Sequence, residues 1–181
     1  IDKTGGTVTF SAGLTATDFT DYVSGSTVAS DFVDVLAADN AVDIAYTGSA
    51  LDATTKSTDI NTLATYSTGG KSVGAITAAV TGTDSELRNL STSSSRSDAI
   101  TFTVENQTSR QNATLVLAKT AASTIDFSQG IVGSLNSGNS SSLIGSDDLI
   151  NTETKNIIAR DPDVKIEINN APSNFINSIQ K

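Results

Sequence analysis

The sequence predicts an all-β fold, an antiparallel β-sandwich of jelly-roll or immunoglobulin-like type with one or two short peripheral helices. Several short segments alternate apolar and polar residues, as strands with one buried face do. The β-branched residue Thr is abundant, while Ser, Asn and Asp draw hydrogen bonds away from a helical ladder. Long helical patterns between the alternating segments are missing, so we do not expect a parallel sheet. The length of 181 residues suits a single β-rich domain over 1–181, with a subdivision near 81–98 as the alternative.

The first half of the chain contains three predicted strands. In the first, 7–11, Val8 and Phe10 share one face; the others are 41–47 and 73–80. Segments 17–23 and 30–36 each place a hydroxyl ahead of Asp, which favours short capped helices. The polar stretches between these elements predict loops, at 48–73 with a helical turn after Asp59, and at 81–98.

The second half carries the clearest local pattern. Residues 99–105 and 112–118 both alternate, which predicts an antiparallel hairpin with one buried face. A short strand follows around Ile125 and Phe127, then a loop over 129–142 and a helix from 146 to about 159 that Asp161-Pro162 ends. The last expected elements are a strand over 164–168 and an apolar stripe of Phe175, Ile176 and Ile179.

The composition excludes several kinds of active site. The chain has no Cys, His, Met or Trp, which removes thiolate nucleophiles, imidazole bases, the Ser-His-Asp triad and ordinary zinc or copper sites. The remaining acid–base candidates are carboxylate pairs at 39/43, 147/148 and 161/163. A glycosidase would need such a pair across a sugar-binding cleft, yet the chain has only three Tyr and no Trp for sugar stacking. We therefore expect no enzyme, with no catalytic and no cofactor-binding residues.

The net charge of the chain disfavours some classes of binding partner. With 20 acidic and 11 basic residues the net charge is −9, which disfavours nucleic acid and anionic membrane surfaces. No apolar run approaches the roughly 18 residues of a transmembrane helix. The excess is concentrated in residues 1–55, where eight carboxylates accompany one base, Lys3. This segment is either a solvated acidic face or the place where a cation or a basic partner binds.

Calcium is the only cofactor for which the acids make a case. Asp161, Asp163 and Glu167 form the densest set of oxygen ligands near a predicted loop. The spacing of an EF-hand does not occur, and a structural acid in a turn explains the same residues. We assign no metal ligand and keep Ca²⁺ as an alternative.

Four asparagines lie in N-x-Ser/Thr sequons, which accept glycans in exported proteins. All four fall in predicted loops or at the predicted hairpin. Because Asn, Ser and Thr are common here, several such sequons would also arise by chance. The candidate glycosylation sites are Asn89, Asn106, Asn112 and Asn139.

The composition of the whole chain resembles that of prokaryotic extracellular assembly proteins. Flagellin outer domains, surface-layer subunits and surface-filament subunits are likewise rich in Thr, Ser, Ala, Asn and Asp and nearly free of Cys, Trp and His. Residues 164–175, VKIEINNAPSNF, are similar to the strand-plus-linker ending of bacterial cadherin-like adhesin modules. That family has calcium-binding carboxylates where this chain has Asn169 and Asn170.

The resemblance and the excluded chemistries together imply a non-enzymatic structural subunit at the cell surface. Such a subunit would assemble with copies of itself into a filament or layer by exchanging a terminal strand, either 7–12 or 164–168. A start at Ile1 without Met fits a cleaved export signal or an excised piece. The alternatives are an adhesin module that recognises a glycan or a host protein through loops 81–98 and 129–142, and an excised flagellar outer domain.

Overall fold

The chain forms a mixed α/β structure with parallel sheets, so the prediction of an antiparallel sandwich is wrong. The computed structural model describes residues 8–136, 138–146 and 149–169. The largest sheet has the order β1-β4-β7-β8-β10, and each neighbouring pair in this order is parallel. Its strands are Leu14–Ala16, Val42–Tyr46, Lys71–Gly82, Ala99–Val104 and Asp126–Phe127.

A second parallel sheet continues from the first towards the C-terminus. Its order is β12-β11-β9, formed by Ile166–Asn169, Ile131–Ser134 and Thr108–Ser109. Short strands complete the pairing: β5 (Leu51–Asp52) is parallel to β7, while β6 (Ser67–Thr68) is antiparallel to it. The strands β2 (Val23–Ser24) and β3 (Thr27–Val28) form a separate antiparallel pair.

Helices lie between strands that pair with each other in a parallel sheet. For example, α1 lies between β1 and β4, α3 between β7 and β8, and α5 between β11 and β12. We call each passage from a strand through a helix to the next parallel strand a coil. The helices are α1 (Ser30–Ala38), α2 (Ala53–Thr65), α3 (Asp84–Arg88), α4 (Arg110–Leu117) and α5 (Thr152–Arg160), with 3₁₀ turns η1 (Phe19–Asp21) and η2 (Ser94–Arg96).

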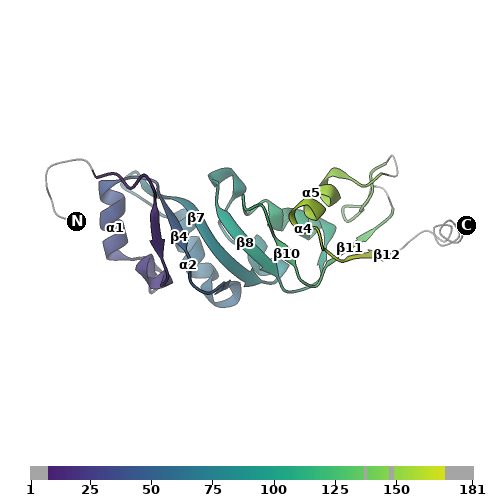
Figure 1. The fold of residues 1–181 in the computed structure, drawn as a ribbon, viewed down its shortest axis with the longest axis horizontal. Helices are drawn as coiled ribbons and strands as arrows, with labels where there is room; N and C mark the ends of the chain where they lie inside the picture. The colour runs from purple at the N-terminus through teal and green to yellow at the C-terminus, as the bar shows by residue number, and fades with distance from the viewer. Residues whose placement is uncertain (1–7, 137, 147–148, 170–181) are drawn as a thin grey trace, which may run out of the picture.

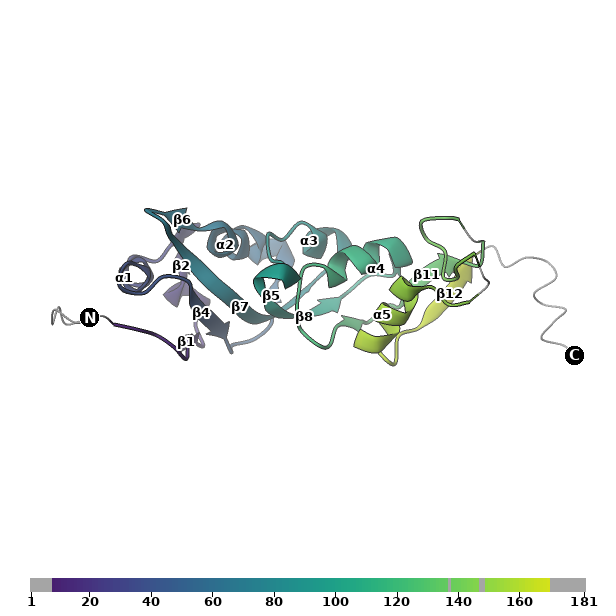
Figure 2. The same cartoon turned by 90° about the horizontal axis from the view of Figure 1, so that it is seen from above.

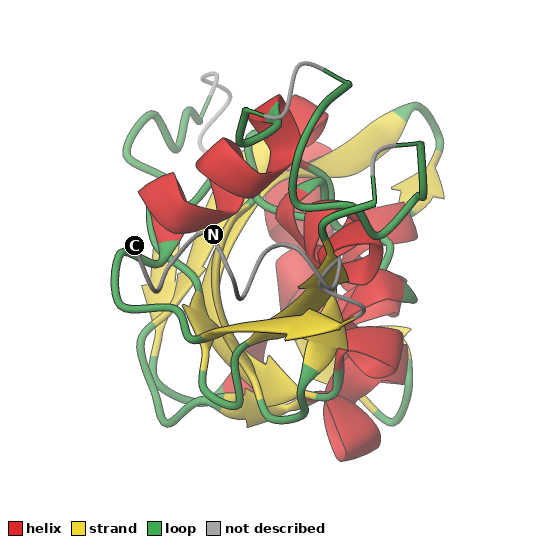
Figure 3. Ribbon diagram, turned by 90° about the vertical axis from the view of Figure 1, so that its right-hand side faces the viewer, coloured by secondary structure: helices red, strands yellow, loops and turns green. Residues whose placement is uncertain are grey.

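The coils stack along one axis and make the molecule elongated (Figure 1). Figure 2 shows α2, α3 and α4 in a row beside the sheet, with α1 and β1 at one end and β11 and β12 at the other. Seen along the axis, strands and helices surround a common interior (Figure 3). The buried apolar side chains of both kinds of element form one cluster along this interior. Each coil therefore buries its apolar face against the next coil, as in a solenoid.

Polar N-caps after the strands begin most of these helices. Asp52 accepts a hydrogen bond from the N–H of Thr54 at the start of α2, and Ser109 accepts one from Asn112 at the start of α4. Thr83 forms a capping box with Glu86 at α3, and Asn151 caps α5. These side chains satisfy backbone donors that the turn from strand to helix would leave unpaired.

The local predictions have mixed outcomes. The strands at 41–47, 73–80 and 99–105 and the helix at 30–36 are confirmed. The hairpin is wrong, because 112–118 lies in α4, where Ala113 and Val116 are buried three residues apart. The predicted loops at 48–73, 81–98 and 129–142 contain α2, α3 and β11, while no strand covers 8–11. Positions 147–148, Asn170 and the stripe at 175–179 lie outside the described residues.

Buried carboxylates join neighbouring coils in the middle of the stack. Asp98, fully buried, accepts hydrogen bonds from the N–H of Ile76 at 2.9 Å and of Ser93 at 2.7 Å, and pairs with Arg96 at 2.8 Å. The guanidinium of Arg96 also donates to the carbonyl of Ala64. Because the carboxylate accepts hydrogen bonds from two backbone N–H groups and is paired with a guanidinium, its charge is compensated away from water.

A second buried carboxylate, Asp84, joins α3 to the following coil. It accepts hydrogen bonds from Asn106 Nδ2 at 2.9 Å, Thr108 Oγ1 at 3.0 Å and Asn112 Nδ2 at 2.6 Å. Burial alone would raise the pKa of Asp84, but these three hydrogen bonds and the nearby Arg88 outweigh it and lower the pKa. The carboxylate thus stays ionised and serves to hold the coils together.

Candidate functional site

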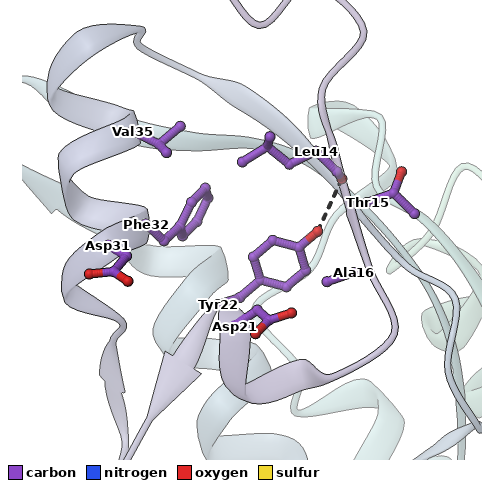
Figure 4. Close-up of a pocket in the computed structure, with 8 residues that line it drawn as sticks. All are labelled: Leu14, Thr15, Ala16, Asp21, Tyr22, Asp31, Phe32 and Val35. Atoms are coloured by element: carbon purple, nitrogen blue, oxygen red, sulfur yellow. Dashed lines mark hydrogen bonds between the residues drawn. The ribbon is translucent and has the colours of Figure 1, made fainter. Parts of the chain in front are cut away.

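The clearest hollow at the N-terminal end is a pocket of 210 Å³ between β1 and α1 (Figure 4). We call it the N-terminal pocket. Its apolar part consists of side chains from β1, from α1 and from the residue after η1, and two carboxylates complete the lining. The lining residues are Leu14, Thr15, Ala16, Asp21, Tyr22, Asp31, Phe32 and Val35.

Tyr22 fixes the shape of the pocket. Its hydroxyl donates to the carbonyl of Leu14 at 3.0 Å and to that of Ala45 at 3.2 Å, so it ties β1 and β4 to the segment before α1. Its ring packs edge-on against Phe32, with the centroids 5.3 Å apart. Burial, together with the negative charge of Asp21, raises the pKa of Tyr22, which keeps the phenol protonated as a donor.

The surroundings of the pocket are acidic. Asp21 and Asp31 are both exposed. Residues 8–55 contain seven carboxylates and no Lys or Arg, so no basic side chain of this segment compensates them. An apolar hollow beside carboxylates that form no ion pair within the described residues is complementary to an aliphatic group that lies next to a cation.

The C-terminal end presents the opposite chemistry. Ile166 and Ile168 pair in register with Ile131 and Gly133, whose side of the sheet is buried. Residues directly opposite each other in neighbouring strands point to the same face, so both isoleucines lie on the core-facing side. They are nevertheless 40% and 41% exposed, whereas Ile131 is 0% exposed. Within the described residues, nothing stacks on β12 from outside.

A cation adjoins this exposed apolar strand. Lys165 precedes β12 and is exposed, while its carbonyl accepts the N–H of Ile131 at 2.8 Å. Gly130 makes this close approach possible: its φ is +75°, and a Cβ there would lie 2.5 Å from the carbonyl oxygen of Lys165. One edge of β12 is therefore hydrogen-bonded to β11, and its other edge pairs with no strand in the described structure.

The four predicted sequon asparagines are far from equivalent. Asn106 and Asn112 direct their amide nitrogens, the atoms that would carry a glycan, to the carboxylate of Asp84. Asn89 and Asn139 are exposed. Glycosylation at any of the four stays a prediction, with Asn89 and Asn139 the more accessible positions.

The predicted carboxylate sets do not converge. Asp161 accepts the N–H of Phe127, and Glu167 accepts from Gln107 Nε2 at 2.7 Å. The carboxylates of Asp39 and Asp43 accept backbone N–H groups of Phe10 and Ala75. In the part of the chain that the structure describes, no three acidic side chains gather as a metal ion would require.

Sequence reasoning named the acidic segment 1–55 and the terminal strands 7–12 and 164–168 as contact regions, but it missed the N-terminal pocket and the exposed isoleucines of β12. The pocket was hidden because its lining comes from segments whose contact depends on the parallel pairing of β1 with β4. A signal did exist for part of it: Phe32 and Val35 have helical spacing, and Asp31 lies beside them. The alternation of 164–168 identified the last strand but not the fact that its core-facing side would remain uncovered.

Comparison of the chain with profiles of protein families, with curated proteins and with solved structures gives no match. Among the residues described, no helix combines the length and apolar character needed to cross a membrane.

Proposed function

We propose that this protein is a non-enzymatic structural subunit of the cell exterior that assembles with copies of itself, end to end. The observation that carries the proposal is the C-terminal end of the described stack, where no described strand lies beyond β12 and Ile166 and Ile168, on its core-facing side, are 40% and 41% exposed. Solenoids normally cover such an end with a polar capping repeat. An uncapped end can instead be covered by another molecule.

The other end of the stack supports the same proposal. β1 is also the outermost strand of its sheet in the described structure, and the N-terminal pocket opens beside it. A contact between two different surfaces produces an open chain of subunits wherever the rotation between copies does not close into a ring. The extracellular location is supported by the composition of the chain, which lacks reactive side chains.

The hydrogen bonds of two buried carboxylates, Asp84 and Asp98, support a structural role. Asp84 and Asp98 are enclosed and occupied with hydrogen bonds between coils, so they stabilise the stack. The adhesin alternative relied on open loops at 81–98 and 129–142, and parts of both are now helix or strand.

The test is the concentration dependence of size. We expect light scattering and electron microscopy of the purified chain to show linear oligomers that lengthen with concentration. A double variant, Ile166→Ser with Ile168→Ser, should remain monomeric with an unchanged circular dichroism spectrum.

The matched control is Leu115→Ser. Leu115 is 45% exposed, but it lies on α4 in the body of the stack, so its loss should leave assembly unchanged. A monomer at every concentration, or equal effects of the end and control variants, would overturn the proposal.

A further inference from the structure

We infer that assembly is head-to-tail, with β12 of one copy lying parallel to β1 of the next and its isoleucines covering the N-terminal pocket. This inference rests on the proposed function and specifies its partner: a second copy of this chain, bound through its opposite end.

The direction of the strands favours this arrangement. The pairs β1–β4, β4–β7, β7–β8 and β11–β12 are all parallel, so the outermost described strands at the two ends of the stack, β1 and β12, both belong to parallel sheets. A second copy placed further along the axis can add its β1 to β12 in the same direction. A two-fold contact between two β12 strands would make them antiparallel instead.

The chemistry of the two surfaces is complementary. We call the C-terminal end with β12 the tail and the N-terminal end with β1 and the N-terminal pocket the head. The tail offers Ile166 and Ile168 with Lys165 directly before them. The head offers the apolar pocket of 210 Å³, room for an isoleucine side chain, with Asp21 and Asp31 beside it. Burying the isoleucines there removes apolar surface from water, and Lys165 comes to lie near carboxylates that lack a basic partner among residues 8–55.

The two symmetric alternatives lack this match. A head-to-head contact would bring together two copies of a segment with seven carboxylates and no base. Like charges opposed across an interface disfavour association. A tail-to-tail contact would bury the isoleucines but oppose two copies of Lys165 and leave both N-terminal pockets open.

The absence of Cys from the chain allows a direct test by disulfide cross-linking. Thr15 is the central residue of β1, and Glu167 lies between the two isoleucines of β12. In a parallel pairing of the two strands these central residues come within disulfide distance. We therefore expect Thr15→Cys and Glu167→Cys, mixed and oxidised, to form a heterodimer.

The control is Thr101→Cys, an exposed residue of β8 in the middle of the stack. Cross-linking of Thr15→Cys with Glu167→Cys should exceed that with Thr101→Cys by at least about tenfold, because assembly raises the local concentration of the partner thiol. Each variant oxidised alone should give little dimer.

The outcomes separate the inference from the proposed function. Strong self-dimers of Glu167→Cys, or assembly without the mixed cross-link, would overturn the head-to-tail contact while self-assembly stands. A chain that never leaves the monomeric state would overturn the proposed function, and the inference with it.

Discussion

An isoleucine on the core-facing side of a strand is buried in the middle of the stack but exposed at its C-terminal end. Ile100 on β8 and Ile166 on β12 both belong to parallel strands and both lie on the core-facing side, yet Ile100 is 0% exposed and Ile166 is 40% exposed. The difference comes from the next coil outward. Thr120 hydrogen-bonds to the backbone of Ile100, and β10 pairs with β8 at Thr103 and Val104, whereas β12 is the outermost strand in the described structure. Burial in this fold is therefore a property of the neighbouring coil as much as of the residue.

The largest expected effect is at Asp98, in the middle. Replacing it by Ala removes the acceptor for two backbone N–H groups and the partner of Arg96. Because these groups are left buried and unpaired, we expect a loss of about 4 kcal/mol in the free energy of unfolding. Urea denaturation followed by circular dichroism measures it.

The matched substitution towards the end is Asp161→Ala. Within the described residues, the Asp161 side chain accepts a single hydrogen bond, from the N–H of Phe127 at 2.8 Å. We expect a loss of about 1 kcal/mol there. Equal losses at the two positions would contradict the comparison between middle and end.

The second prediction compares the isoleucines directly. Ile100→Ala should cost about 3 kcal/mol through lost burial and a cavity, and Ile166→Ala less than about 1 kcal/mol. Urea unfolding at a concentration where the chain is monomeric separates these values from any effect on assembly. If Ile166→Ala destabilised the monomer as strongly as Ile100→Ala, some part of the same chain would cover β12 and the open end would not exist.

The third prediction uses the pH dependence of Asp84. Its pKa in the folded protein is lowered, because hydrogen bonds from Asn106, Thr108 and Asn112 and the charge of Arg88 outweigh burial. The stability from this carboxylate is therefore fully present above the unfolded pKa of about 3.9, and it is lost as the pH falls through the lower folded pKa.

The variant Asp84→Asn tests this contribution. It should be less stable than the wild type by about 2 kcal/mol at pH 7, because the new amide group would face the donor groups of Asn106, Thr108 and Asn112. The difference should shrink in acid, and urea unfolding from pH 7 to pH 2 follows it. Asp31→Asn, at an exposed position near the head, is the control and should change monomer stability by less than about 0.5 kcal/mol. A constant difference at all pH values would show that ionisation of Asp84 is not responsible.

The smallest expected effect concerns the charges at the two ends. Lys165→Glu should weaken assembly by about two- to fivefold at low salt, because exposed ion pairs contribute little. Adding Asp31→Lys to the same chain should restore it, and 0.5 M salt should reduce both effects. Sedimentation measures the association constants. Weakening without restoration would place Lys165 away from Asp31 in the contact.

Parts of the fold could be predicted from residue patterns. Strands such as 42–46 and 99–104 have one buried and one more exposed face, so their alternation is visible in the sequence. The helix at 112–117 was misread because Ala113, Leu115 and Leu117 alternate as a strand would, while only Ala113 and Val116 are fully buried. Of the helix at 53–65 only a turn after Asp59 was predicted, because its buried residues, Ala53, Ile60 and Leu63, are few among polar ones.

The sequence by itself determined the chemistry that is excluded, the acidic character of the N-terminal segment and the positions of several strands. Each of these depends on the side chains present or on residues a few positions apart. The tertiary structure alone decided that the strands are parallel, that Tyr22 joins β1 and β4 beside a pocket, and that Ile166 and Ile168 remain exposed. These features depend on which coil lies next to which, and pairings between strand residues 22 to 35 positions apart leave no local period in a chain.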